Sequence, residues 1–272
     1  MKKLKIFYDI DTQNDFMNKD GALYVPDAEL IKPNLKLLTD YARKNHIVVI
    51  GSVDRHFGTP EYKHQEQELK IWGGPFPNHC MDGTPGQIKI PETTLAPAQG
   101  IAADWLTANG NDFGVYIYHM IYHGYPREPI PGAIREVWKD PEELKAVWEE
   151  NLKGIDEGLL DLALARIEKV KQRKNTPEGI YFEKQHYDIF TNPNAEELLR
   201  RANVKEAFVY GVATDYCVKA AVLGMQQRGI QCFVVEDAIK GVFPESTKTA
   251  LEEITRAGAK LITTNNVLEG RL

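Results

Sequence analysis

Short apolar runs alternate with amphipathic stretches along most of this chain, and this alternation constrains its fold more than any other feature. Short β-rich runs of this kind predict strands, here at residues 4–10, 47–50, 179–184, 207–212, 230–235 and 260–263. Apolar residues at helical spacing predict helices at about 27–45, 194–202 and 245–257 and directly after Cys217, with Asn192 or Asn194 as a cap and Gly258 as a stop. Strands that alternate with helices imply right-handed crossovers, so we predict an α/β fold with a parallel sheet and helices on both faces.

Residues from about 93 to 178 break the alternation. We interpret this stretch as a mostly helical insertion near the carboxyl edge of the sheet, within a single domain that spans residues 1–272. Its clearest element is a helix expected at about 155–172, whose apolar face holds Leu159, Leu162, Ala163, Ile167 and Val170. A lid over a functional site and a contact between subunits are both roles that such a segment can take.

Charge and composition narrow the class of function. The chain has 33 basic and 39 acidic residues and no basic block, so we expect no nucleic-acid partner. We expect no membrane partner, because no apolar stretch approaches the length of a membrane span. The basic start of the chain resembles a signal peptide, but Asp9 and Asp11 interrupt its apolar run. Three cysteines do not form a disulfide framework, so we expect a reducing, cytoplasmic location.

Cys217 is the first candidate catalytic residue, because it lies where a predicted strand ends and a helix begins. The dipole and free N–H groups of a first helical turn favour negative charge, and the thiolate is the reactive form of cysteine. The same amides could hold the oxyanion of a tetrahedral intermediate. On position alone, a cysteine that packs as a small hydrophobic side chain is the favoured explanation of Cys217, because most intracellular cysteines are inert.

Two further charged residues lie at strand ends. Asp11 follows the first predicted strand and Lys184 ends another, and a parallel sheet brings such ends to one edge however far apart they are in sequence. Asp11 could accept the proton of Cys217, while Lys184 could stabilise both the carboxylate and the thiolate. Taken singly, Asp11 could cap a turn and Lys184 could be a solvated strand end.

A second cluster contains Asp54, His56 and His79. In a strand, Asp54 and His56 point to the same side, and His79 in the following loop could complete a site with three ligands. One carboxylate and two imidazoles suit Zn²⁺, Fe²⁺ or Mn²⁺. Spacing alone is a weak signal for metal binding.

These motifs, in this order, resemble those of the isochorismatase-like cysteine hydrolases, and within that superfamily those of the nicotinamidases. The residues that carry the resemblance are Asp11-Thr-Gln-Asn-Asp-Phe16, Asp54-Arg-His56, Pro77-Asn-His79-Cys80, Gly83-Thr-Pro-Gly86, Lys184 and Gly211-Val-Ala-Thr-Asp-Tyr-Cys217. The resemblance implies a Rossmann-like three-layer fold and a catalytic triad of Asp11, Lys184 and Cys217. It covers the chain except for the insertion at 93–178.

The resemblance also implies details of the site. It implies a cis peptide bond before Ala213 and an oxyanion hole formed by the amides of Ala213 and Cys217. One divalent transition metal (Zn, Fe or Mn) at Asp54, His56 and His79 would bind the pyridine nitrogen of the substrate. Phe16 and Phe76 match the aromatic residues that enclose the ring, and we expect Val212 and Tyr187 beside them. The chain has Arg55 where the family usually has tryptophan between the first two metal ligands, and Phe76 where tryptophan is common.

The expected function is therefore a metal-dependent amidohydrolase that converts nicotinamide to nicotinate and ammonia through a cysteine thioester, a step in NAD salvage. One alternative is a cysteine amidase of the same superfamily that acts on a different small carboxamide, with the insertion as a specificity lid. The other is a non-catalytic homologue that binds a small molecule or a partner. A homo-oligomer is an expectation from the family alone.

Overall fold

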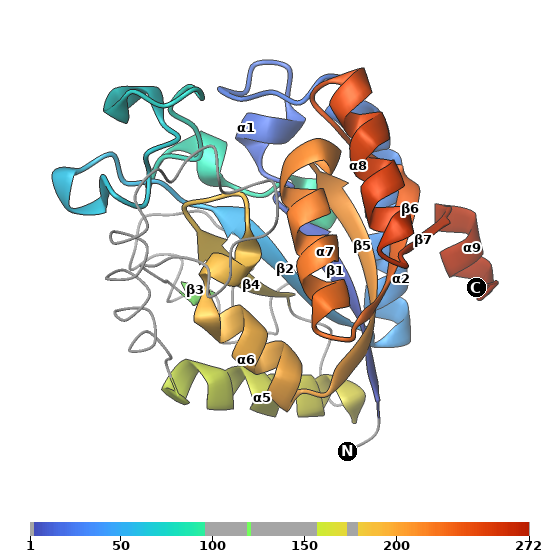
Figure 1. Cartoon of the computed structure of the whole chain (residues 1–272). Coiled ribbons are helices and arrows are strands. Elements are labelled where there is room, and N and C mark those ends of the chain that lie inside the picture. The colour runs from blue at the N-terminus through green and yellow to red at the C-terminus, as the bar shows by residue number, and fades with distance from the viewer. Residues whose placement is uncertain (1–2, 96–118, 121–156, 173–178, 272) are drawn as a thin grey trace.

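The computed structural model of this protein describes residues 3–95, 119–120, 157–172 and 179–271, and within them it contains one parallel sheet. The strands are β1 (Leu4–Ile10), β2 (Val48–Asp54), β3 (His119–Met120), β4 (Gly179–Lys184), β5 (Val204–Val212), β6 (Gln231–Lys240) and β7 (Lys260–Ile262). Their order across the sheet is β3-β4-β2-β1-β5-β6-β7, and every neighbouring pair is parallel. The amino terminus lies at the lower edge in Figure 1, so the carboxyl ends of the strands lie at the upper edge.

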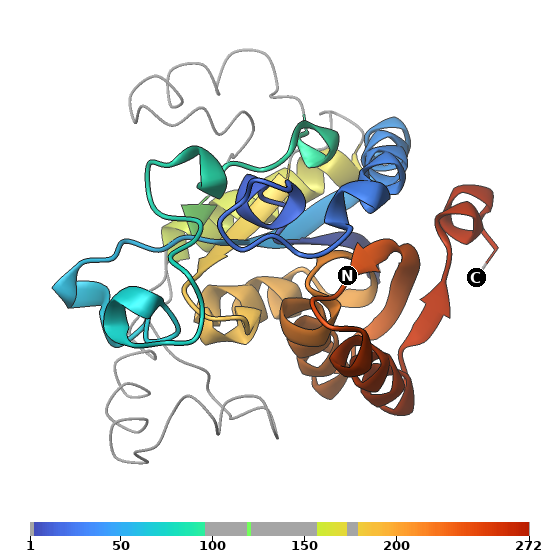
Figure 2. The same cartoon turned by 90° about the horizontal axis from the view of Figure 1, so that it is seen from above.

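Helices cover both faces of the sheet, which confirms the predicted three-layer α/β fold. The helices are α1 (Asn14–Met17), α2 (Lys32–Asn45), α5 (Glu157–Lys171), α6 (Pro193–Arg201), α7 (Lys219–Gln227), α8 (Pro244–Arg256) and α9 (Thr264–Glu269). Buried residues of α5 to α8 pack in one core, and those of α1, α2 and α9 pack in the other. Figure 2 shows α2 on one side of the sheet and α7 and α8 on the other.

The two cores follow from the alternation of side chains along β1. Ile6, Tyr8 and Ile10 belong to the core beneath α5 to α8, whereas Phe7 belongs to the opposite core. A strand covered on both faces has apolar residues at successive positions, which is why the central strands could be recognised as continuous apolar runs. The apolar stripe predicted after Cys217 (Val218, Ala221, Val222 and Met225) is buried in the core that also contains residues of α5, α6 and α8.

Most predicted boundaries agree with the structure, and the differences have local causes. Asn192 caps α6, since its side chain accepts a hydrogen bond from the amide of Asn194 at 3.0 Å. The strand predicted at 47–50 continues to Asp54, because Gly51 and Ser52 interrupt the apolar pattern but remain buried in the sheet. The helix predicted from about 27 begins with a 3₁₀ turn at Ala28–Ile31 before α2 starts. Helix α9 was not predicted.

Part of the predicted insertion belongs to the sheet and its helical layer. Strand β3 pairs with β4, and α5 buries Leu160, Ala163, Ile167 and Val170 against the core. Ala163, Ile167 and Val170 lie on this face as predicted and Leu160 joins them, while the side chains of Leu159 and Leu162 lie outside the described residues. Residues 96–118, 121–156 and 173–178, which make up the rest of the insertion, lie outside the described residues.

The topology brings four strand ends together at one edge. Strand β1 lies between β2 and β5, and the chain crosses from one side of β1 to the other, so the sheet has a topological switch point there. Gly211 near the end of β5 has φ +116°, and a Cβ atom at this residue would lie 2.1 Å from the carbonyl oxygen of Ile10. Only glycine therefore lets β5 approach β1 this closely.

Among the described helices, none has the length and apolarity that a membrane span requires.

Candidate active site

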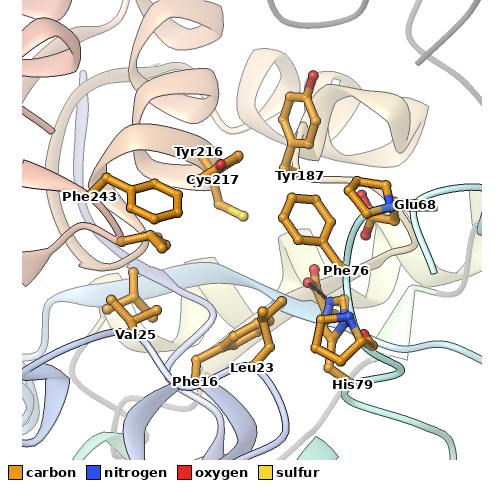
Figure 3. A pocket seen from close by; sticks show the side chains of 16 residues that line it. Phe16, Leu23, Val25, Glu68, Phe76, His79, Tyr187, Tyr216, Cys217 and Phe243 are labelled. Carbon is orange, nitrogen blue, oxygen red and sulfur yellow. Dashed lines mark hydrogen bonds and ion pairs between the residues drawn. The ribbon is translucent and has the colours of Figure 1, made fainter. Parts of the chain in front are cut away.

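The three predicted catalytic residues converge at the carboxyl edge of the sheet. Asp11 directly follows β1, Lys184 ends β4, and Cys217 lies in a π-helical turn (Thr214–Val218) between β5 and α7. The Nζ atom of Lys184 lies 2.9 Å from Oδ2 of Asp11 and 3.5 Å from Sγ of Cys217. All three side chains are buried, and Figure 3 shows the sulfur of Cys217 turned into the pocket.

Burial controls the protonation of this group. Burial raises the pKa of the Cys217 thiol well above its ordinary value, and the neighbouring Asp11 carboxylate adds to the increase, while the Lys184 ammonium acts in the opposite direction. This differs from the expectation that the helix terminus would favour a thiolate. The thiol needs a base to become nucleophilic, and Asp11 lies beside it.

Asp11 is suited to accept a proton. Burial raises the pKa of its carboxyl group above the ordinary value, while Lys184 and a hydrogen bond from Ser52 act to lower it. The hydroxyl of Ser52 donates to Oδ1 of Asp11 at 2.7 Å. Ser52 lies on β2, opposite Ile10 on β1, so the sheet register sets the orientation of the carboxylate.

A second group of buried side chains lies beside the first. Asp54 at the end of β2, His56 and His79 are joined by Glu68, and one potential ligand atom from each lies within 4.8 Å of the others. The Nε2 atom of His79 lies 3.5 Å from Oδ2 of Asp54, and that of His56 lies 3.6 Å from Oε1 of Glu68. Two carboxylates and two imidazoles are a donor set that suits Zn²⁺, Fe²⁺ or Mn²⁺.

The hydrogen bonding of the histidines fits a metal ion. Both ring nitrogens of His56 are buried and have no hydrogen-bond partner among the described residues, although such atoms are normally paired. The Nδ1–H group of His79 donates to the carbonyl oxygen of Pro77 at 2.8 Å, which leaves Nε2 free to coordinate an ion. Burial raises the pKa of Glu68 to about 8, while the neighbouring His79 acts to lower it.

Sequence reasoning missed Glu68. It lies in the loop between β2 and His79, where nothing in the spacing separates it from the neighbouring Glu66. The loop folds back through a bridge between Leu69 and Phe76, and the amide of Phe76 donates to the carbonyl of Glu68 at 2.9 Å. The available signal was that Glu66 and Glu68 lie between His56 and His79 in the sequence, and this does not identify which of the two carboxylates points toward the histidines.

Arg55 occupies the position between the first two candidate metal ligands. Its guanidinium pairs with Asp82 and with the buried carboxylate of Glu183, each at 2.8 Å. The backbone of Arg55 donates to the carbonyl of Lys184 at 3.1 Å. Arg55 therefore ties the end of β2 to the end of β4 and to the turn that follows His79.

One pocket of about 420 Å³ is lined by Cys217 of the first group and by Asp54, Glu68 and His79 of the second. The predicted substrate-binding residues Phe16, Phe76, Val212 and Tyr187 all line it, as do Ala213 and Cys217. Its other lining residues include Leu23, Val25, Tyr216, Val242 and Phe243, which sequence analysis did not identify. Figure 3 shows Phe76 in the middle of the pocket, between Cys217 and His79.

The turn that carries Cys217 is held to the following helix. Asp215 accepts hydrogen bonds from the amides of Val242 and Phe243 at 2.9 and 3.1 Å and from the hydroxyl of Ser246 at 2.6 Å. These bonds hold the two residues that directly precede α8 against the turn that carries Cys217. The peptide bond between Val212 and Ala213 is cis, as the resemblance implied. The other cysteines, Cys80 and Cys232, are buried.

Comparisons with known proteins agree with this geometry. The family model described as the isochorismatase domain matches residues 167–266. A nicotinamidase/pyrazinamidase of Mycobacterium tuberculosis is 22% identical over 258 residues, which cover 93% of this chain and 95% of that protein. A nicotinamidase of Escherichia coli is 40% identical over 70 residues, which cover 25% of this chain and 33% of that protein.

Solved structures show the same fold. The pyrazinamidase of Pyrococcus horikoshii, solved in complex with zinc, aligns with a TM-score of 0.58 and 20% identity over 95% of this chain and 98% of that one. The family match includes β4, β5 and Cys217, and the alignment with the Mycobacterium protein covers 93% of the chain. The chain therefore resembles the isochorismatase-like superfamily in fold and over residues 167–266, and the relatives that it resembles include nicotinamidases.

Proposed function

We propose that this protein is a cysteine amidase that hydrolyses a small carboxamide, with nicotinamide as the first candidate substrate. One observation carries the proposal: a buried acid, ammonium and thiol meet beside a cluster of four potential metal ligands, and the thiol and three of these ligands line a single pocket. The similarity to nicotinamidases supports the choice of substrate. A protein that only bound a small molecule would have no chemical need for this arrangement.

The proposed reaction uses the residues as follows. Asp11 accepts the proton of the Cys217 thiol, and the thiolate attacks the carboxamide carbon. Lys184 stabilises the negative charge that moves between Asp11 and the sulfur, because its ammonium lies within 2.9 Å of one and 3.5 Å of the other. Backbone amides of the Ala213–Cys217 turn would stabilise the oxyanion.

The nitrogen then leaves with the proton that Asp11 carries, which gives ammonia and a thioester on Cys217. Water adds to the thioester, Asp11 takes up its proton, and the carboxylate product leaves as the thiol forms again. The sum is one water consumed, with one carboxylic acid and one ammonia released. Asp11 thus acts first as a base and then as an acid, a cycle that the raised pKa of its carboxyl group favours.

Asp54, His56, Glu68 and His79 would hold a divalent transition metal. When bound, such an ion supplies a Lewis-acidic position that can fix a heteroatom of the substrate. Phe16 and Phe76 lie next to His79, with ring centroids 5.4 and 6.5 Å from it, so an aromatic ring held at this end would lie between apolar faces. This arrangement would place the carboxamide of a bound ring toward Cys217.

The test is release of ammonia from nicotinamide by the purified protein, with metal content measured on the same sample. We expect turnover together with roughly one transition metal ion per chain. The Cys217→Ala variant, purified in the same way, controls for contaminating amidase. Absence of turnover on nicotinamide and on a panel of other small carboxamides, by protein that carries its metal, would contradict the proposed activity.

A further inference from the structure

The pocket has two chemically different ends, and Cys217 lies between them. Figure 3 shows His79 and Glu68 on one side of Cys217 and Val25 and Phe243 on the other. We name the first the metal end. The second, formed by Val25, Val242 and Phe243, is the apolar end. A single aromatic ring that binds at the metal end and presents its carboxamide to Cys217 therefore leaves the apolar end without a ligand group.

The apolar end is held in place by backbone hydrogen bonds. Asp215 accepts from the amides of Val242 and Phe243, so both residues are fixed relative to the turn that carries Cys217. On the opposite wall, the amide of Val25 donates to the carbonyl of Phe16 at 2.9 Å. Both walls are thus tied to elements that carry candidate catalytic or ring-binding residues. A preformed wall binds a ligand without the cost of ordering it.

The exposure of Phe243 indicates that this end binds an apolar group. Its side chain is 58% exposed, one of the few large hydrophobic side chains at the surface of the described residues. Exposed apolar residues at the rim of a concave site are typical of ligand contacts. The pocket volume of about 420 Å³ falls in the range that accommodates ligands much larger than a single-ring carboxamide.

We propose that the natural substrate is a carboxamide with a second, apolar group, and that this group binds between Val25, Val242 and Phe243. The inference rests on the proposed amidase function and specifies the substrate class of the same site. The two sides of the scissile carbonyl allow two attachments. An apolar group on the amide nitrogen leaves as a primary amine, protonated by Asp11 in place of ammonia, whereas an apolar group on the ring stays with the carboxylate product.

The experiment compares nicotinamide with two propyl derivatives, one substituted on the amide nitrogen and one on the ring. Values of kcat/KM are measured with the metal-loaded enzyme, and dissociation constants are measured by calorimetry with the metal-loaded Cys217→Ala variant. Burial of a methylene group strengthens binding by about fourfold. We therefore expect at least one propyl derivative to bind about tenfold or more tightly than nicotinamide. The derivative that binds more tightly shows whether the apolar group of the substrate is attached to the amide nitrogen or to the ring.

Two substitutions locate the effect. Phe243→Ala should reduce the preference for that propyl derivative to about threefold or less, and Phe243→Leu should restore most of it. Leu30→Ala is the matched control, because Leu30 is an equally exposed apolar residue, 63% exposed, that does not line the pocket. The preference should be unchanged in this variant.

The possible results separate this inference from the proposed function. Hydrolysis of nicotinamide with no preference for either derivative, in turnover or in binding, overturns the apolar end and leaves the amidase in place. A preference for a propyl derivative that stays unchanged in Phe243→Ala also contradicts binding at the apolar end. If no compound is hydrolysed but a propyl derivative binds tenfold more tightly in a manner that depends on Phe243, the amidase proposal fails and the apolar end stands.

Discussion

The ammonium group of Lys184 donates a hydrogen bond to Oδ1 of Asp54. Lys184 therefore joins the acid of the catalytic group to a carboxylate of the metal-ligand group, since it also pairs with Asp11 at 2.9 Å. The two carboxylates compensate the burial of this ammonium and keep its pKa well above the ordinary value, although burial alone would lower it. Lys184 stays charged at neutral pH and holds both groups at fixed positions.

The first prediction separates the nucleophile from the metal site. Cys217→Ala should lower kcat by about 10⁴-fold or more, because no other described thiol lines the pocket. Metal content should stay the same, since the sulfur is not among the potential ligands. Stopped ammonia assays and elemental analysis test both. Cys232→Ala, a buried cysteine away from the pocket, should keep its activity, and loss of metal in Cys217→Ala would contradict the separation of roles.

The second prediction concerns the ligand that sequence analysis missed. Glu68→Gln should weaken metal binding by about 100-fold or more, because it removes a charged donor from a buried cluster. A competition titration with a chelator measures the affinity. Glu66→Gln is the comparison: its carboxylate accepts hydrogen bonds from the amides of Phe57 and Gly58 and lies outside the four-donor group. Unchanged metal affinity in Glu68→Gln would exclude Glu68 as a ligand.

Arg55 provides the third prediction. Arg55→Met removes the guanidinium that pairs with the buried Glu183 carboxylate, so the free energy of unfolding should fall by about 3 kcal/mol. Metal affinity should fall about tenfold, because the strand ends on either side are no longer held together. Denaturant titration and chelator competition measure the two effects. The double variant Arg55→Met/Glu183→Met should recover stability but not metal affinity; recovery of both would assign Arg55 a role in stability alone.

The pH dependence of activity gives the fourth prediction. The hydroxyl of Ser52 stabilises the charged form of Asp11, so its removal in Ser52→Ala should raise the pKa of that carboxyl group. A base acts only when it is deprotonated, so the acid limb of the kcat/KM profile should move to higher pH. Ser52→Thr keeps the hydroxyl and should keep the limb near its original position. A shift to lower pH would exclude Asp11 as the base.

The fifth prediction concerns stability. Burial raises the pKa of Asp188 from 3.8 to about 6, so the folded state holds this proton more tightly than the unfolded state does. The carboxylate destabilises the fold increasingly as pH rises from about 4 to 6, by about 3 kcal/mol in total, and below that window the effect is absent. Asp188→Asn should therefore be more stable than the parent protein by about 3 kcal/mol at pH 7, and this difference should shrink to about 1 kcal/mol near pH 4.5.

Urea unfolding at several pH values between 4.5 and 7 measures this difference. The amide of Phe190 donates a hydrogen bond to Oδ1 of Asp188 at 3.0 Å. The asparagine side chain also has an oxygen that can accept this bond, so the cap of the turn at Ile189–Thr191 remains. A difference in stability that does not change with pH would show that Asp188 does not titrate in this range.

The order of elements could be predicted because strands buried on both faces require continuous apolar runs, and β1, β4 and the strand before Cys217 are such runs. The positions of Asp11, Lys184, Asp54 and Cys217 follow from the same reasoning, since each lies at the end of a strand and parallel strands end at one edge. Their roles in catalysis and metal binding remain predictions. The ends of β2 and β6 were harder to predict, because polar residues can stay buried within a sheet.

The sequence by itself determined which residue types lie at the carboxyl edge, since periodicity and strand ends are local properties of the chain. Only the tertiary structure decided that Glu68 faces His56, that Arg55 pairs with Glu183 and that Phe243 borders the same pocket as Cys217. These contacts join loops and strand ends that are distant in sequence, and their geometry depends on how the loops fold back. The strand order, which places β4, β2, β1 and β5 side by side, was also decided there.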